Sequence, residues 1–521
     1  MDRRIAVGQH FFTGFAGPKM TESFIRDVRE HKIGNVILFE YNVESKEQLA
    51  LLCRQIRELI LAETGQVPFI AIDQEGGTVT RLKEDATIFP CAMAIAATGD
   101  TQNAYEAGYV TGLELRAMGV NMNLAPVMDV NSDPRNPVIG VRSYGDDPST
   151  VSRFGVAMAQ GLVDGGVLSC AKHFPGHGDT AVDSHIGLPL IEKSIEAMEI
   201  CELVPFQAAI KAGVSAIMTA HILFPALEPD RLPATLSRRI ITGLLRQKLG
   251  FQGLILSDCM MMYAISEDYG TIEGSVVAIQ AGVDMVFISH DVSLAAQAVI
   301  ATHTALMEGH LDESFFDAST ARILASKATL SKDIPPLHTV GSDAHRQKSL
   351  HATYASLTMV NDTPFTLGNN PLFLGCTRFR PTLAANPEDE TQRFPIAMQS
   401  LLGGDARITP PNPTTEDIKA ALIDSHEHSA IVIGLYKALH YKAQLKMVRA
   451  AAATGMPVCA VALRNPFDLM ELPPNVRAYA IYDYDARTMA AFADVLSGKH
   501  VCTGQLPLRR FKRDMPATPS S

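Results

Sequence analysis

The sequence contains no run of about 18 consecutive apolar residues, and this absence excludes a membrane-spanning helix. It contains no basic stripe either, and its formal net charge is −11. That acidic balance argues against nucleic acid or an anionic membrane surface as the main partner. Low-complexity tracts are also absent, and 47% hydrophobic with 19% charged residues is the composition of a soluble globular protein.

The eight cysteines are scattered, and no two of them form a Cys-x-x-Cys pair. This pattern predicts reduced thiols in a cytoplasmic protein rather than a disulfide framework or a zinc knuckle. The first residues, MDRRIAVGQHFFTGFAG (1–17), lack a sustained apolar core and a clear cleavage site. We therefore expect a first strand here rather than a secretion signal.

Short apolar runs alternate with helical patterns through the first two-thirds of the chain. The strand candidates are residues 5–15, 35–40, 68–75, 120–130, 167–174, 215–224, 253–260 and 285–291. Stretches between them, such as 45–63 and 293–309, place apolar residues at helical spacing. Alternating strands and helices indicate a parallel sheet covered by helices. Eight strands over roughly 300 residues fit a (β/α)8 TIM-type barrel, with a doubly wound open sheet as the alternative.

The composition changes at residues 333–349, which are rich in Pro, Gly, His and charge and are typical of a linker. Further strand candidates follow at 371–376, 430–436, 457–463 and 476–483, with helical patterns such as 441–455 between them. Four or five parallel strands of this length indicate a small open α/β sandwich. The predicted organisation is a barrel at 1–332, a linker at 333–349 and an α/β sandwich at 350–521.

Ionisable residues follow one predicted strand after another at its carboxyl end. They are Asp73 and Glu75, Asp129, Lys172 and His173, His221, Asp258, and His290 with Asp291. The carboxyl ends of barrel strands converge on one face, where the active site lies. Each residue alone could instead cap a helix or satisfy a loop backbone. Together they favour one convergent site.

The segment AKHFPGHGDTAVDSH (171–185) combines ionisable residues with Gly and Pro in a way that no ordinary helix or strand does. Asp183 lies two residues from His185, close enough to orient the imidazole and to raise its basicity as a general acid/base. His173, His177 and His185 could instead hold zinc, but a loop rich in Gly and Pro is a poor frame for a metal. The segment also lacks the Gly-Lys-Ser/Thr ending of a phosphate-binding loop.

Asp258 directly follows a predicted strand in GLILSDCMMM (253–262), where its surroundings are apolar on both sides. A carboxylate in this position could bind a metal, act as a base or act as a nucleophile. It could also cap the next helix, a role that Ser257 could fill as well.

Four motifs, in this order along the chain, resemble the family 3 glycoside hydrolases and more narrowly their bacterial β-N-acetylglucosaminidase branch. They are AIDQEGGTVTRL (71–82), NLAPVMDVNSDPRNPVIGVRSYG (123–145), KHFPGHGDTAVDSH (172–185) and LSDCMMM (256–262). The segments ALRNPFDL (462–469) and VLSGKHVCTGQLPL (495–508) resemble second-domain motifs of the family. The resemblance implies a barrel followed by an α/β sandwich, a retaining mechanism, and no metal or other cofactor.

The same resemblance implies roles for individual residues. Asp258 matches the nucleophile, His185 the acid/base and Asp183 the partner of His185. Contacts to the sugar are implied for Asp73, Arg81, Arg142, Lys172 and His173. We interpret His177 and Asp179 as supports of their loop. The Asp-Ser-His segment selects the glucosaminidase branch, because other branches take a glutamate acid/base from the second domain.

The implied reaction is retaining hydrolysis of terminal β-linked N-acetylglucosamine from cell-wall muropeptides or chitin-type fragments. The chain has no tryptophan, which excludes a long cleft with a tryptophan stacking platform and favours an exo-acting pocket for a small carbohydrate. Two alternatives remain. One is a phosphorylase of the same fold, in which phosphate replaces water as the acceptor, and the other is a non-catalytic carbohydrate-binding protein.

Overall fold

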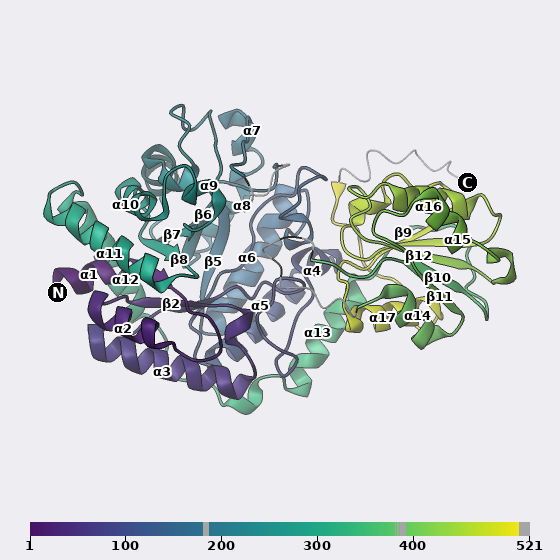
Figure 1. Cartoon of the computed structure of the whole chain (residues 1–521), viewed down its shortest axis with the longest axis horizontal. Helices are drawn as coiled ribbons and strands as arrows, with labels where there is room; N and C mark the ends of the chain where they lie inside the picture. Colours follow the sequence, from purple (N-terminus) through teal and green to yellow (C-terminus); the bar gives the residue numbers. More distant parts are fainter. Residues whose placement is uncertain (181–186, 381, 383–384, 386–391, 510–521) are drawn as a thin grey trace.

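The computed structural model describes residues 1–180, 187–380, 382, 385 and 392–509. Figure 1 shows a barrel, coloured purple to teal, beside a second unit coloured green to yellow. In the described part of the chain, no helix is both long enough and apolar enough to cross a membrane.

Eight parallel strands close into a barrel in chain order, with β8 pairing back to β1. The strands are β1 (Phe11–Thr13), β2 (Asn35–Leu38), β3 (Ile70–Ile72), β4 (Met122–Asn123), β5 (Leu168–Phe174), β6 (Ala216–Thr219), β7 (Leu254–Cys259) and β8 (Met285–Ile288). The predicted (β/α)8 barrel is therefore confirmed, and the open sheet is excluded.

Helices and short 3-10 turns surround this barrel. The α-helices are α1 (Arg3–Gly8), α2 (Glu22–His31), α3 (Lys46–Thr64), α4 (Ala92–Ala97), α5 (Thr101–Ala117), α6 (Pro148–Asp164), α7 (Ile195–Glu199), α8 (Leu203–Lys211), α9 (Tyr263–Ser266), α10 (Thr271–Ala281), α11 (Val292–Met307) and α12 (Glu313–Ala328). A π-helical segment, η4 (Arg239–Lys248), precedes β7, and the 3-10 turns are η1 (Glu40–Asn42), η2 (Gly140–Arg142) and η3 (Ala234–Leu236).

Large side chains fill the barrel from the amino ends of its strands up to Phe287, which lies near the carboxyl end of β8. The rings of Phe12 and Phe287 stack with centroids 4.1 Å apart, and Phe69 lies 6.3 Å from Phe12. Below them Lys327, on α12, donates to Gln9 Oε1 at 2.6 Å, and its Nζ lies 5.2 Å from the ring centroid of Phe69. Because this end is closed, a ligand has access only from the carboxyl ends of the strands.

The first predicted strand, residues 5–15, was wrong in its first half. Residues 3–8 form helix α1, and only Phe11–Thr13 pair as a strand. The Asp2 side chain accepts a hydrogen bond from the backbone N–H of Arg4 and so caps the helix. Arg3 also forms ion pairs with Glu313 and Asp317 of α12, which fix the helix to the barrel.

The second unit contains a six-stranded sheet in the order β11-β10-β12-β13-β14-β9. Its strands are β9 (Thr358–Asn361), β10 (Leu372–Gly375), β11 (Asp405–Ile408), β12 (Ile431–Leu435), β13 (Val458–Ala462) and β14 (Arg477–Ala480). Its helices are α13 (Asp343–Ser356), α14 (Phe394–Leu402), α15 (Thr415–Ala421), α16 (Ala443–Ala452) and α17 (Ala486–Leu496), with turns η6 (Ser425–Glu427) and η7 (Pro466–Leu469). The predicted α/β sandwich is confirmed, with two additional strands, of which β9 is antiparallel.

The core of the second unit includes part of the barrel half of the chain. Met93 and Ala97 of α4 are buried in the same apolar cluster as the inner side chains of β10, β12 and β13, and Figure 1 shows α4 between the two units. The backbone N–H of Cys91, just before α4, donates to Asp483 Oδ2 at 2.8 Å. Gly77 has a φ of +56°, and a Cβ there would lie 2.5 Å from Asp483 Oδ1. The loop after β3 is therefore pressed against the second sheet.

The range predicted as a linker, 333–349, contains turn η5 (Leu337–Thr339) and the beginning of α13. Glu114, a buried residue of α5, holds this segment in place. Its carboxylate accepts hydrogen bonds from Gly341 N at 3.0 Å, from Thr87 N at 2.8 Å and from His345 Nδ1 at 2.7 Å. Burial opposes the charge, but these donors outweigh it and lower the pKa of Glu114. The division of the chain at this linker stays a prediction.

Replacing Glu114 by Ala should leave these three donors without their acceptor. We expect the free energy of unfolding to fall by about 3 kcal/mol, measured as a shift of the urea midpoint by circular dichroism. Glu106→Ala is the matched control, because Glu106 lies on the same helix and pairs with Lys348 in a more exposed position. Its effect should stay within about 0.5 kcal/mol. Equal losses in the two variants would contradict the proposed role of Glu114.

Candidate active site

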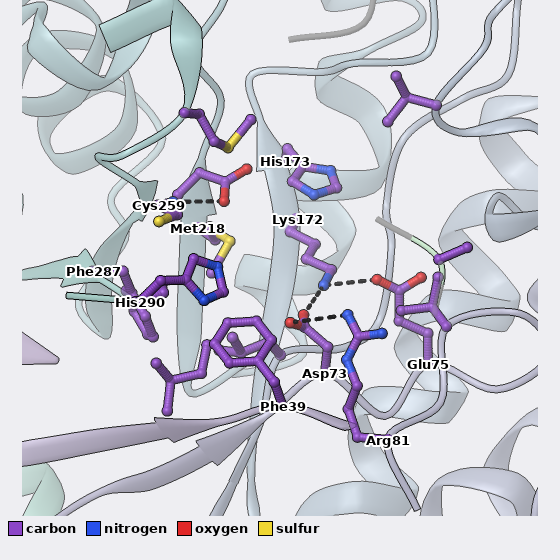
Figure 2. Close-up of a pocket in the computed structure, with 18 of the residues that line it drawn as sticks. Phe39, Asp73, Glu75, Arg81, Lys172, His173, Met218, Cys259, Phe287 and His290 are labelled. Atoms are coloured by element: carbon purple, nitrogen blue, oxygen red, sulfur yellow. Dashed lines mark hydrogen bonds and ion pairs between the residues drawn. The ribbon is translucent and has the colours of Figure 1, made fainter. Parts of the chain in front are cut away.

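A cavity of about 560 Å³ opens at the carboxyl ends of the barrel strands. One wall is charged and carries Asp73, Glu75, Arg81, Arg142, Lys172 and His173. The other wall is largely apolar and includes Phe39, Met218 and Phe287, with His290 beside them. Figure 2 shows these walls facing each other, with Lys172 and Asp73 on one side and His290 and Phe39 on the other. A wall of each kind suits a sugar ring, which has hydroxyl edges and apolar C–H faces.

The charged wall is organised around Glu75, whose side chain is largely covered by its neighbours. Its carboxylate accepts from Arg142 Nε and Nη2, both at 2.8 Å, and Lys172 Nζ lies 2.7 Å from Oε1. Lys172 also donates to Asp73 Oδ1 at 2.7 Å, and Arg81 Nη2 lies 3.7 Å from Asp73 Oδ2. One continuous ion-pair network therefore connects the loop after β3 with β5 and with η2.

Burial and ion pairing oppose each other in this network. Burial disfavours the charge on Glu75, yet Arg142 and Lys172 outweigh it and hold the pKa of Glu75 well below its usual range. Burial likewise disfavours the charge on Lys172, and Asp73 with Glu75 reverse this and raise the pKa of Lys172. The ammonium and the Glu75 carboxylate therefore stay ionised at neutral pH, and Lys172 can donate to a ligand oxygen.

A buried carboxylate holds the ring of His173. Asp129, fully buried, accepts from His173 Nδ1 at 2.7 Å and from the backbone N–H of His177 at 2.7 Å. Burial opposes the charge on Asp129, but the two histidines outweigh it and its pKa is lowered. An ionised Asp129 accepts a hydrogen bond from Nδ1–H of His173. Nε2 is therefore the His173 nitrogen that remains for a ligand.

Asp258 lies at the end of β7 and lines the cavity. Its Oδ1 accepts a hydrogen bond from Cys259 N at 2.7 Å. It caps no helix, because the N-cap of α9 is Met262, and Ser257 instead accepts from Phe287 N at 3.0 Å. The capping interpretation is therefore wrong for both residues, and Asp258 lies at the cavity instead.

The structure brings together most of the residues predicted at strand ends. Asp73, Glu75, Lys172, His173, Asp258 and His290 all line the cavity. Three others have supporting contacts. Asp129 holds His173, His221 lies with Nε2 3.0 Å from Cys259 O, and Asp291 caps α11 by accepting from Leu294 N at 3.0 Å. The alternative interpretation was thus correct for Asp291, which caps a helix, and in part for Asp129, which satisfies a loop backbone by accepting from His177 N.

Asp183 and His185 lie outside the described residues, so their predicted pairing stays a prediction. The loop before them is well anchored. Asn136 Nδ2 donates to His177 O at 2.9 Å, and Asp179 pairs with Lys193 at 2.9 Å. These contacts agree with the interpretation of His177 and Asp179 as loop supports.

Within the described ranges, the group of His, Cys, Asp and Glu side chains close enough to share one metal ion is Asp27, Glu30 and His31 on α2. These residues do not line the cavity. The expectation that the reaction needs no metal stays a prediction.

A family model for the glycosyl hydrolase family 3 N-terminal domain matches residues 5–326, more than half of the chain. The chain belongs to glycosyl hydrolase family 3. The family resemblance of the four motifs is thereby confirmed, and with it the prediction of a glycoside hydrolase.

This family 3 chain is 36% identical over 380 residues to β-hexosaminidase A of Pseudoalteromonas piscicida, which covers 68% of this chain and 63% of that protein. It is 35% identical over 290 residues to a β-hexosaminidase of Thiobacillus denitrificans, covering 54% of this chain and 79% of that protein. A family 3 β-N-acetylglucosaminidase from Paenibacillus sp. str. FPU-7 has a similar structure, with a TM-score of 0.90 and 36% identity over 98% of this chain and 99% of that one. These matches support the predicted branch.

Glu75→Gln should keep the shape of the side chain and remove the charge that orders Lys172 and Arg142. We expect kcat/KM on a glycoside substrate to fall by about 100-fold, because misplaced contacts to the sugar raise the barrier. Glu63→Gln is the control, since Glu63 pairs with Lys32 away from the cavity, and it should keep full activity.

The pH dependence of kcat/KM gives a second readout of the Glu75 network. A carboxylate with a lowered pKa keeps its charge, and the stabilisation that the charge provides, until the pH falls through that lowered value. In the wild type the Glu75 network should therefore persist well below pH 4.5, the ordinary pKa of glutamate. Unchanged kinetics in Glu75→Gln would show that the network does not order the site.

Proposed function

We propose that the protein is a retaining, exo-acting β-N-acetylglucosaminidase that releases terminal non-reducing β-linked N-acetylglucosamine. The observation that carries this proposal is the position of Asp258 at the end of β7, in a cavity that Lys172, Asp73 and His173 also line. The β-hexosaminidase relatives and the Paenibacillus β-N-acetylglucosaminidase support the choice of sugar.

Asp258 is the proposed nucleophile. Retaining hydrolysis requires an ionised carboxylate on one face of the sugar and a proton donor beside the leaving oxygen. Asp258 attacks the anomeric carbon, the bond to the leaving oxygen breaks, and a glycosyl-enzyme forms. Water then attacks the same carbon, gives its proton to His185 and releases the carboxylate of Asp258. The charged wall binds the hydroxyl groups and holds the ring in place through both steps.

The proposed proton donor is His185, oriented by Asp183, and it rests on the sequence motif. The pocket chemistry supports a donor of this kind. The other carboxylates that line the described cavity are Glu40, Asp73 and Glu75, and each contacts a lysine. For Glu75, ion pairing with Arg142 and Lys172 lowers the pKa well below its usual range, so the carboxylate is ionised near neutral pH and has no proton to donate. Burial lowers the pKa of His177 to about 4, so this imidazole is neutral near pH 7 and has no imidazolium proton to donate.

The proposed natural substrates are cell-wall muropeptides or chitin-type fragments, which places the enzyme in peptidoglycan recycling or chitin degradation. A cavity of about 560 Å³ accommodates a terminal sugar and part of its leaving group. We propose a cytoplasmic location. All eight cysteines are free, which agrees with a reducing compartment.

A panel of 4-nitrophenyl β-glycosides tests the proposed activity and its nucleophile together. The wild type should prefer N-acetylglucosamine over glucose and N-acetylgalactosamine. Asp258→Asn should retain its fold and lose more than 95% of turnover, and a fluorinated glycosyl inhibitor should label Asp258, as mass spectrometry of peptides would show. A preference for glucose, or substantial activity in Asp258→Asn, would refute the proposal. Free sugar in phosphate buffer would support hydrolysis, whereas sugar 1-phosphate would show a phosphorylase.

The proposed dyad has its own test. His185→Ala should be impaired most on glycosides with poor leaving groups, because these need proton donation. An aryl glycoside whose leaving group has a pKa near 7 should still form the glycosyl-enzyme, with a burst followed by slow turnover. Asp183→Ala should be milder and should move the pH profile to lower pH. Equal losses on good and poor leaving groups, without a burst, would assign the pair a structural role.

A further inference from the structure

The apolar wall of the cavity contains one polar pair that the proposed mechanism does not use. The Tyr41 hydroxyl and His290 Nδ1 lie 2.9 Å apart. Tyr41 follows β2 and His290 follows β8, so the pair spans β1, which lies between these strands in the barrel. The ring of Phe39 packs against both side chains, with its centroid 4.4 Å from His290 and 5.5 Å from Tyr41.

The position of the proton in this pair follows from the surroundings. Burial raises the pKa of Tyr41 to about 12, so its hydroxyl keeps its proton at neutral pH. Burial also lowers the pKa of His290, so its imidazole is neutral and carries one N–H. A phenol is a stronger hydrogen-bond donor than a neutral imidazole, and an imidazole nitrogen is the better acceptor. Tyr41 therefore donates to Nδ1, and the imidazole proton lies on Nε2.

The Nε2–H group is available to a ligand. Neighbouring side chains cover part of the His290 ring, the rest of the side chain is exposed, and His290 lines the cavity. Within the described part of the chain, no protein group accepts a hydrogen bond from Nε2. His290 also does not cap α11, because Asp291 does. Figure 2 shows the His290 ring on the opposite side of the cavity from Lys172 and Asp73.

We propose that Tyr41 fixes His290 as a neutral Nε2–H donor, and that this donor binds one hydroxyl oxygen of the sugar on the side away from Lys172 and Asp73. His290 is then a specificity-determining residue and Tyr41 its positioning residue. The inference rests on the proposed function, because the ligand is the glycoside bound for hydrolysis. A site with a fixed donor disfavours analogues that lack the matching hydroxyl, since a bound analogue that displaces water leaves the donor unpaired.

The test uses 4-nitrophenyl N-acetylglucosaminide and its 3-, 4- and 6-deoxy analogues on the full-length protein. His290→Leu removes the donor at similar volume, and its kcat/KM on the parent substrate should fall about tenfold. The wild type should discriminate against one deoxy analogue by about the same factor, and His290→Leu should lose that discrimination alone. His290→Gln should restore it in part, because the amide N–H of Gln occupies the place of Nε2–H.

Tyr41→Phe tests the positioning role. It should raise KM more than it lowers kcat and weaken discrimination at the same hydroxyl, because the imidazole can then carry its proton on either nitrogen. Tyr105→Phe is the control, since the Tyr105 hydroxyl donates to Asp164 on the surface at 3.0 Å. It should match the wild type on every substrate.

The outcomes separate two failures. A wild type that does not hydrolyse the N-acetylglucosaminide would refute the proposed function. A wild type that hydrolyses it, with unchanged discrimination in both His290→Leu and Tyr41→Phe, would overturn the inference alone. A His290→Leu defect confined to poor leaving groups would also overturn it, because it would make His290 a proton donor.

Discussion

Glu75 brings a negative charge into a wall of the pocket where its side chain is only 7% exposed, and Lys172 and Arg142 make this burial favourable. Each of the three side chains would be costly to bury alone. Together they are fixed at hydrogen-bond distance, and each reaches the wall from a different segment: the loop after β3, strand β5 and turn η2. The network therefore determines where three segments lie relative to one another before any sugar binds. Such preorganisation spares the reaction the cost of ordering these groups.

The second wall follows a different principle. It is formed by apolar side chains such as Phe39 and Met218, and its polarity is limited to a few groups. A hydrogen bond from one neutral donor in such surroundings is directional, whereas the opposite wall attracts any oxygen through charge. The two walls divide the work of recognition. The charged wall provides binding strength, and the apolar wall distinguishes between sugars with different patterns of hydroxyl groups.

Much of this organisation could be predicted from the sequence, because barrel strands are buried on both sides and produce short continuous apolar runs. The edge strand β11 could not, since its side chains are partly exposed and show no such run. Convergence of Asp73, Lys172 and Asp258 followed from their positions at strand ends. The contact between Tyr41 and His290 did not, because it depends on the closure of the barrel, which brings residues 249 positions apart into contact.

Helix α4 carries a consequence for the modularity of the chain. Its apolar side chains complete the core of the second sheet, while the loop before it carries Glu75 and Arg81 and touches Asp483 through Gly77. The two units are therefore not structurally independent domains. A recombination event that exchanged the second unit for an unrelated one would leave α4 without its partner and would disturb the charged wall of the cavity at the same time. Substitutions in the barrel or in the second unit are constrained by the contacts between them, so the two units have to evolve together.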